Sequence, residues 1–134
     1  MHPKLHATRE ETLELARSLR AVVFDVDGVV TNNQVWQGFP YKVKIRSYYD
    51  GQGISLLRAI GIRVCFVTNE KDDHAAAITE IVEKFNKLPS SQKPENPGGW
   101  PPVLLFTGMG GPRKVEAAEL FAKEIGVPAS ACAA

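Results

Sequence analysis

The chain has 134 residues, with 16 Lys and Arg residues against 15 Asp and Glu residues, and a formal net charge of +1 at pH 7. This length fits one domain, and a content of 44% hydrophobic and 23% charged residues is that of a globular protein. The near-zero charge argues against a broad surface for nucleic acid or an acidic membrane, and no run approaches the ~18 apolar residues of a membrane span. We therefore expect one cytoplasmic domain over residues 1–134, with no nucleic-acid and no membrane partner.

The first elements expected are a helix and a buried strand. After a short tail, residues Thr8 to Glu11 fit a capping box, which predicts a helix that reaches about Arg20 and turns Leu15 and Leu19 inward. The all-apolar run Ala21–Phe24 then predicts a strand that is covered on both faces.

Residues 31–49 predict a β-hairpin inserted after this strand. The segment is rich in Val, Ile, Tyr and Trp, and from Tyr41 to Arg46 apolar and basic residues alternate. This period of two is typical of a strand with one solvent-exposed face. A short helix over Ile54–Ile60 follows, ended by Gly61.

The second half of the chain predicts two further buried strands, each followed by a helix. Cys65 lies within the first of these strands, which predicts a buried free thiol. A proline-rich surface loop over residues 88–102 separates the two strand–helix pairs. The expected elements are the strands Ile62–Val67 and Val103–Phe106, a helix capped by Asp72 or Asp73 with Ile78, Ile81, Val82 and Phe85 on its buried face, and a helix that starts at Pro112, buries Val115, Ala118, Ala122 and Ile125, and ends at Gly126.

Buried strands that alternate with amphipathic helices predict an α/β, Rossmann-like fold, with a mostly parallel sheet, helices on both faces and a protruding hairpin. Ligands of such sheets bind beyond the carboxyl ends of the strands. In this sequence Asp25 and Asp27, Thr68, and Lys114 follow three different strands. The pattern therefore predicts two carboxylates, a hydroxyl and an ammonium group along one edge.

Asp25 and Asp27 are two residues apart, so on an extended backbone their side chains point to the same side. Two carboxylates this close repel each other unless a cation, a proton or hydrogen bonds compensate, and Mg²⁺ prefers oxygen ligands of this kind. Gly28 lets the backbone approach an anion. The alternative is a strand followed by an ordinary Asp-Gly turn without chemistry, and local sequence leaves both open.

The segment Asp25-x-Asp27-Gly28-x-x-Thr31 resembles the first motif of the haloacid-dehalogenase-like (HAD-like) phosphatases. The hairpin, the segment Asp50-Gly51-x-Gly53 and the strand that leads to Thr68 are similar to the capless subgroup, the 3-deoxy-D-manno-octulosonate 8-phosphate phosphatases. The resemblance extends from about Ala21 to Ile125, interrupted by the proline-rich loop. It implies a Mg²⁺-dependent phosphomonoesterase that acts on a small phosphorylated sugar or sugar acid.

The same resemblance implies roles for particular residues. Asp25 is expected to be the nucleophile that forms an aspartyl-phosphate, and Asp27 the general acid and base. Thr68 and Lys114 are expected to contact the phosphoryl group. The remaining expectations are Gly28 and Asn69 as phosphate-binding residues, Asp50, Gly51 and Gly53 as substrate-binding residues, Asp25 and Asp27 as Mg²⁺ ligands, and a homo-oligomer, a tetramer, formed through the hairpin.

Three departures from the family pattern leave a second hypothesis open. Asn69-Glu70 stands where the family has Gly-Arg, and Tyr49 where it has Arg. The family's fourth motif, a Gly-Asp-Asp-type segment that supplies a further Mg²⁺ ligand, would follow a strand that Ser130–Ala134 begins, so we expect weak Mg²⁺ binding by this chain. The alternative is a catalytically weak or inactive oligomerisation domain, like the one attached to some acylneuraminate cytidylyltransferases.

Overall fold

A four-stranded parallel sheet forms the centre of the computed structural model, which describes residues 8–27, 29, 31–37, 42–91 and 99–133 and, for residues 31–46, 48 and 49, the backbone alone. The strand order is β5-β4-β1-β6, and every neighbouring pair is parallel. The strands are β1 (Ala21–Asp25), β4 (Arg63–Val67), β5 (Val103–Phe106) and β6 (Cys132–Ala133). The three predicted strands are confirmed, and β6 begins where Ser130–Ala134 predicted a further strand.

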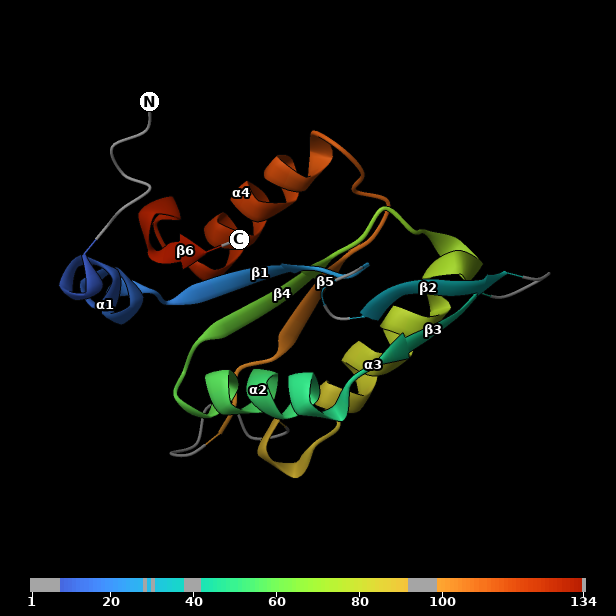
Figure 1. Cartoon of the computed structure of the whole chain (residues 1–134), viewed down its shortest axis with the longest axis horizontal. Helices are drawn as coiled ribbons and strands as arrows, with labels where there is room; N and C mark the ends of the chain where they lie inside the picture. Colours follow the sequence, from blue (N-terminus) through green and yellow to red (C-terminus); the bar gives the residue numbers. More distant parts are fainter. Residues whose placement is uncertain (1–7, 28, 30, 38–41, 92–98, 134) are drawn as a thin grey trace.

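Helices cover both faces of this sheet, as the alternation of elements predicted (Figure 1). The helices are α1 (Arg9–Ser18), α2 (Tyr48–Ala59), α3 (Ala76–Asn86) and α4 (Arg113–Ile125), with 3₁₀ turns at Asp72–Ala75, Pro89–Ser91 and Ala129–Ala131. Ile54 of α2 and Ile78, Val82 and Phe85 of α3 pack on one face, against Val64 and Phe66 of β4. Ala117 and Phe121 of α4 pack on the other face, against Val23 of β1 and Cys65 and Val67 of β4. The predicted Rossmann-like α/β architecture is therefore confirmed.

The register of the sheet aligns the carboxyl ends of its strands. Asp25 pairs with Val67, and Val67 pairs with Phe106. The strands thus end side by side, and the residues that follow them start from one edge. This edge lies on the same side of the sheet as the hairpin (Figure 1).

The hairpin consists of β2 (Thr31–Gln37) and β3 (Lys42–Arg46), which pair antiparallel as a separate two-stranded sheet. The predicted hairpin is confirmed, although residues 38–41, its expected turn, lie outside the described residues. The predicted start of the next helix at Ile54 is wrong, because α2 begins at Tyr48 and includes Gly51 and Gly53. Ile54 is buried and Leu57 packs on the core, and this packing outweighs the roughly 1 kcal/mol that each glycine costs a helix.

The N-terminal helix has the predicted cap but not the predicted packing. The Thr8 hydroxyl accepts the Glu11 N–H, and the Glu11 carboxylate accepts the Thr8 N–H, both at 3.1 Å. However, α1 buries no residue, and Leu15 is 64% exposed. The inward orientation predicted for Leu15 is wrong because α1 lies beyond the amino-terminal ends of the strands, where no described element covers it (Figure 1).

Two details of the later helices also differ from the prediction. Asp72 and Asp73 lie in a 3₁₀ turn, and the residue that precedes α3, Ala75, offers no side-chain cap. In α4 the buried residues include Ala117 and Phe121, whereas Val115 is 64% exposed. Val115 lies two residues from Ala117, about 200° around the helix, so it faces away from the sheet.

The sequence did not predict that Arg58, near the end of α2, is fully buried. Its guanidinium donates to the carbonyl oxygens of Pro101 at 2.9 Å and Phe85 at 3.3 Å, and to the Ser91 hydroxyl at 2.6 Å. The Ser91 hydroxyl in turn donates to the Phe85 carbonyl at 2.7 Å. Arg58 therefore ties α2 to the end of α3 and to both sides of the proline-rich loop, whose residues 92–98 lie outside the described residues.

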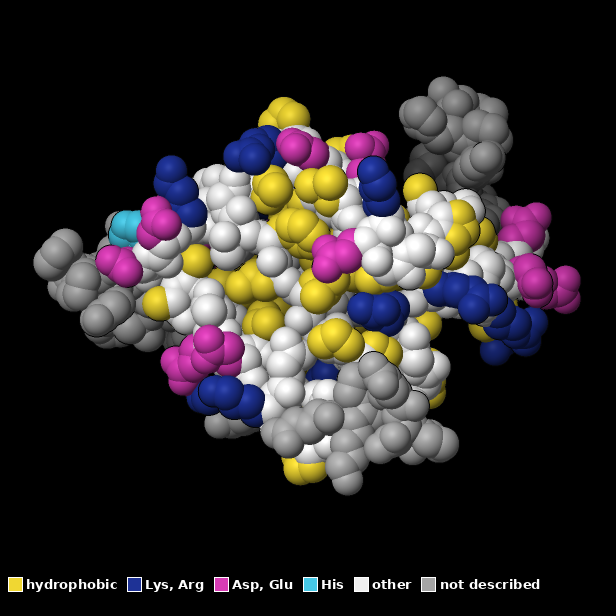
Figure 2. All heavy atoms as spheres, turned by 180° about the vertical axis from the view of Figure 1, so that it is seen from behind, with side chains coloured by type: hydrophobic (Ala, Val, Ile, Leu, Met, Phe, Trp, Pro, Cys, Tyr) yellow, Lys and Arg dark blue, Asp and Glu magenta, His cyan; other side chains and the backbone are white. Residues whose placement is uncertain are grey.

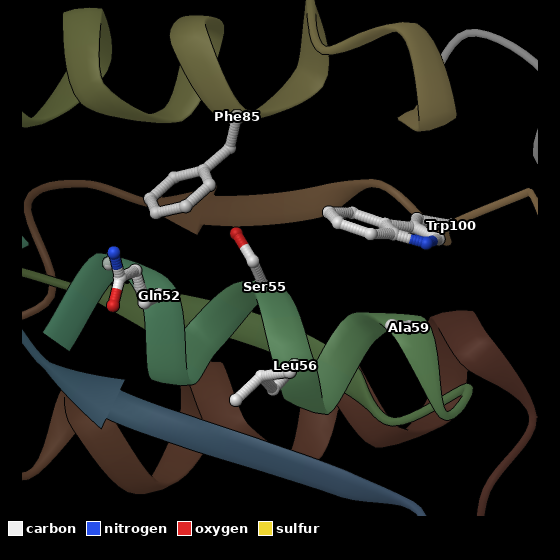
Figure 3. Close-up of a pocket in the computed structure, with 7 residues that line it drawn as sticks. Gln52, Ser55, Leu56, Ala59, Phe85 and Trp100 are labelled. Carbon is white, nitrogen blue, oxygen red and sulfur yellow. The ribbon is translucent and has the colours of Figure 1, made fainter. Parts of the chain in front are cut away.

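An open groove of about 560 Å³ lies over α2 next to this arginine. Phe85 and Trp100 face the helix, and Ser55 points between their rings (Figure 3). The Arg58 guanidinium lies 5.9 Å from the centre of the Phe85 ring and 5.7 Å from that of Trp100. Both aromatic walls of the groove are thus fixed by the same buried cation.

Apolar side chains gather in the middle of the face that Figure 2 shows, with Lys, Arg, Asp and Glu around them. The charges of both signs are interspersed along this rim, in keeping with the net charge of +1. No helix in the described part of the chain is both long and apolar enough to cross a membrane.

Candidate functional site

Asp25 and Lys114 meet at the carboxyl edge of the sheet. Asp25 is the last residue of β1, and Lys114 is in the first turn of α4. The Lys114 ammonium donates to Asp25 Oδ1 at 2.8 Å, and the Val26 N–H donates to the same oxygen at 2.9 Å. The Asp25 side chain is 43% exposed and that of Lys114 is 38% exposed, so a solute can reach the carboxylate. The sequence predicted this contact because both residues follow strands of one parallel sheet, although they are 89 positions apart.

Asp27 lies two residues beyond Asp25 and is exposed. Between them, Val26 is buried in the core that α2 and α3 share, so the backbone of this segment is anchored to the sheet. The other residue predicted here, Gly28, lies outside the described residues.

Thr68 directly follows β4 and is fully buried. Its N–H donates to the Phe106 carbonyl at 3.0 Å, and its carbonyl accepts the Met109 N–H at 2.9 Å. Its hydroxyl accepts the Glu70 N–H at 3.1 Å. Thr68 therefore joins the loop after β4 to the loop after β5, and its hydroxyl meets a ligand only when the atoms that cover it move aside.

The next residue, Asn69, is exposed, and its side chain lies against Gly110. A β-carbon built at Gly110 would overlap with the Asn69 Oδ1 atom and lie 2.7 Å from Asn69 Cγ. Gly110 belongs to the loop that leads into α4 and Lys114. The glycine-rich stretch 108–111 was the sequence signal for such a close contact, but the sequence did not identify its partner.

Asp50, Gly51 and Gly53, the predicted substrate-binding residues, lie in the first turns of α2. Gly51 lines the groove over this helix together with Gln52 (Figure 3). Asp25, Thr68 and Lys114 are not among the described lining residues of that groove. The structure thus brings Asp25 and Lys114 into contact, and of the three predicted α2 residues only Gly51 is among the described residues that line the groove.

The oxygen ligands at this edge suit a hard cation such as Mg²⁺, but there are few of them. Asp25 and Asp27 are carboxylates at the end of one strand, which is the ligand chemistry that Mg²⁺ prefers. Among the described residues, no group of three or more His, Cys, Asp or Glu side chains is placed to hold a metal ion. Any metal at this edge would therefore share two described carboxylates at most and complete its coordination with other oxygen atoms.

No protein-family model and no curated protein sequence matches the chain. Solved structures do match. A hypothetical protein from Xanthomonas campestris is 18% identical with a TM-score of 0.71, over 98% of this chain and 62% of the other. The 3-deoxy-D-manno-octulosonate 8-phosphate phosphatase from Moraxella catarrhalis is 19% identical with a TM-score of 0.68, over 93% of this chain and 61% of the other.

A HAD-superfamily hydrolase of subfamily III A from Legionella pneumophila is 21% identical with a TM-score of 0.68, over 90% of this chain and 56% of the other. The chain thus spans less than two thirds of each of these three structures. At sequence identities this low, the matches show only that the backbone fold is shared. The chain has the HAD-like fold of the 3-deoxy-D-manno-octulosonate 8-phosphate phosphatases, as its motifs predicted.

Proposed function

We propose that this chain carries the catalytic residues of a Mg²⁺-dependent phosphomonoesterase, with Asp25 as the nucleophile. The observation that carries this proposal is the contact of 2.8 Å between Lys114 Nζ and Asp25 Oδ1 at the carboxyl edge of the sheet. The fold places ligands at this edge, and the pair combines a nucleophilic carboxylate with a cation for phosphoryl oxygens.

The hydrogen bonds of Asp25 assign different tasks to its two oxygens. Oδ1 accepts from the Val26 N–H and from Lys114, which fixes the plane of the carboxylate. Oδ2, which accepts no hydrogen bond from the described residues, is the oxygen that attacks phosphorus. Its attack forms an aspartyl-phosphate and breaks the bond from phosphorus to the ester oxygen. The Lys114 ammonium lies beside the new bond and stabilises negative charge on the phosphoryl oxygens.

Asp27 completes the proton balance in this proposal. In its acid form it donates a proton to the leaving alkoxide, which departs as an alcohol. In its carboxylate form it then takes a proton from water, whose oxygen attacks phosphorus and releases inorganic phosphate, restoring Asp25. General acid–base help of this kind typically contributes ~10²–10⁴-fold. Most of the acceleration must therefore come from positioning and from the charges around the phosphoryl group.

The Asp25 carboxylate and the Asp27 backbone carbonyl would hold Mg²⁺, because both are oxygen donors at one strand end, and the Asp27 carboxyl group would carry the proton. Bound there, the ion would neutralise charge on the phosphoryl oxygens. The Moraxella catarrhalis phosphatase was solved with a magnesium ion, a phosphate ion and the sugar acid. On this basis we propose a small phosphorylated sugar or sugar acid as the substrate, and a contact of Thr68, Asn69 and the segment around Gly28 with its phosphate. Asp50, Gly51 and Gly53 would contact the sugar.

Phosphate release tests this proposal. The protein is incubated with Mg²⁺ and a panel of phosphorylated sugars and sugar acids that includes 3-deoxy-D-manno-octulosonate 8-phosphate and a nonulosonate 9-phosphate. The proposal predicts turnover that Asp25→Asn abolishes and Asp27→Asn lowers by ~10²-fold or more. Activity that survives Asp25→Asn at the wild-type rate contradicts it.

Two observations favour a second candidate function, a catalytically weak or inactive oligomerisation domain. The described residues offer two carboxylates for a metal but no third His, Cys, Asp or Glu side chain beside them. In addition, Asn69-Glu70 adds an acidic residue after Thr68, where it disfavours an anionic substrate. This candidate predicts no phosphate release from any member of the panel and an assembly that Asp25→Asn leaves unchanged, which light scattering measures.

A further inference from the structure

The loop that leads into α4 and Lys114 is attached to the loop after β4 by a continuous series of contacts. The Gly108 N–H donates to the Glu70 carbonyl at 2.8 Å, and the Met109 N–H donates to the Thr68 carbonyl at 2.9 Å. The contact of Asn69 with Gly110 continues this series by one more residue. The two loops therefore behave as one unit as far as Gly110.

The first turn of α4 is built directly on this unit. The Arg113 N–H donates to the Gly110 carbonyl at 3.2 Å, and the Lys114 N–H donates to the Gly111 carbonyl at 3.1 Å. The Arg113 guanidinium also donates to the Gly108 carbonyl at 3.2 Å. A displacement at Gly110 thus passes to α4 through its own hydrogen bond with Arg113 and through the adjoining Gly111, which bonds Lys114.

The Asn69 side chain occupies the space that a β-carbon at position 110 would need. The β-carbon would overlap with Asn69 Oδ1 and lie 3.3 Å from Asn69 Cβ. Gly110 has no left-handed backbone conformation, in contrast to Gly108 and Gly111 with φ of +66° and +55°. A side chain at position 110 would therefore meet the Asn69 side chain and not backbone strain, so either Asn69 or the loop must move to admit it.

We propose that Asn69 and Gly110 form a positioning pair that sets the location of the Lys114 ammonium relative to Asp25. Asn69 acts on Lys114 through the loop, a role separate from the phosphate contact that the proposed function gives it. This inference deepens the proposed function and rests on it for its effect on turnover. A misplacement of about 1 Å at a catalytic group lowers a rate by up to ~10²-fold, so the pair is expected to govern kcat more than KM.

The test adds a methyl group at position 110 and, in a second variant, also removes the Asn69 side chain that the methyl group would meet. Gly110→Ala is expected to lower kcat about tenfold or more, with KM changed less than threefold, because the new methyl group displaces the loop. In the double variant Asn69→Gly/Gly110→Ala the methyl group occupies the space that Asn69 vacates, and kcat should recover at least fivefold over Gly110→Ala. Gly111→Ala is the matched control. No atom of the described residues lies within 4 Å of a β-carbon built there, so its defect comes from φ, and Asn69→Gly should not rescue it.

Crystal structures of the same variants provide a readout that does not depend on turnover. The distance from Lys114 Nζ to Asp25 Oδ1 is expected to exceed 3.5 Å in Gly110→Ala and to return to the 2.8 Å of the wild type in the double variant. A distance unchanged in Gly110→Ala, with Asn69 rotated away, overturns the inference. A lengthened distance that the double variant does not restore also overturns it. A protein without phosphatase activity that shows the expected distances contradicts the proposed function and leaves the positioning pair standing.

Discussion

The buried Arg58 offers a sharp test of what holds the α2 side of the molecule together. The variant Arg58→Met keeps most of the apolar stem but removes the guanidinium, which is fully buried and donates to Phe85, Ser91 and Pro101. Burial lowers the pKa of this guanidinium, because the charged group loses water contacts, and these three hydrogen bonds replace them. We expect the loss of the bonds to outweigh the relief from burial of the charge.

The magnitude follows from the acceptors that remain. The Pro101 carbonyl loses its donor, and a buried acceptor left without one costs roughly 1–3 kcal/mol. Phe85 and Ser91 keep their mutual hydrogen bond of 2.7 Å, so each loses only its contact with the cation. Loss of the two cation–π contacts adds about 1 kcal/mol, and removal of a buried charge offsets part of the total. After this offset we expect the free energy of unfolding to fall by roughly 1–3 kcal/mol.

Urea denaturation, followed by circular dichroism, measures this difference. The matched control is Arg17→Met, because Arg17 is 74% exposed and only 3.5 Å from Glu14 within one helix, and such pairs contribute at most a few tenths of a kcal/mol. Arg58→Lys should also be destabilised, since one ammonium cannot reach three divergent acceptors. A loss below about 0.5 kcal/mol for Arg58→Met, equal to the control, would refute the reasoning.

Three further predictions concern stability and assembly. Burial, followed by the charge of Glu124, raises the pKa of Cys65 to about 12, whereas an unfolded thiol ionises near ~8.5. Between these pH values only the unfolded state has lost its proton, so the free energy of unfolding should fall by about 1.4 kcal/mol per pH unit as pH rises. Urea titrations should show no such fall in Cys65→Ala. The same dependence on pH in both proteins contradicts the role given to Cys65. Gly126 ends α4 with φ of +69°, so Gly126→Ala should destabilise the protein by about 1 kcal/mol. Gly53 lies inside α2 with open space for a β-carbon, so Gly53→Ala should stabilise the protein by about 0.5–1 kcal/mol. Thermal melts measure both, and equal changes would count against this difference. Light scattering should give the mass of a homo-oligomer, with a tetramer expected, and a monomer mass contradicts the prediction for the hairpin.

The strands and the meeting of Asp25 with Lys114 could be predicted because each depends on a local pattern and one topological rule. Ala21–Phe24 and Val103–Phe106 are short apolar runs, and parallel strands align their carboxyl ends. The start of α2 could not be predicted, because the local preference of Gly51 and Gly53 is overridden by packing further along the helix.

The contacts of Arg58 and Asn69 were beyond prediction for a different reason. The acceptors of Arg58 include backbone carbonyls 27 and 43 residues later in the chain, and a carbonyl has no sequence signature. Gly110 meets Asn69 only because the loops that follow two neighbouring strands lie side by side. Such contacts depend on the three-dimensional course of the loops, which periodicity and composition do not encode.

The central claim is that Asp25 accepts a phosphoryl group while Lys114 and a magnesium ion balance its charge. Fluorine NMR of the protein with Mg²⁺ and beryllium trifluoride, which mimics a phosphoryl group on a carboxylate, tests this claim most directly. We predict bound fluorine resonances in the wild type that disappear in Asp25→Asn and without Mg²⁺. No bound resonance in the wild type, or the same resonances in Asp25→Asn, would contradict the claim.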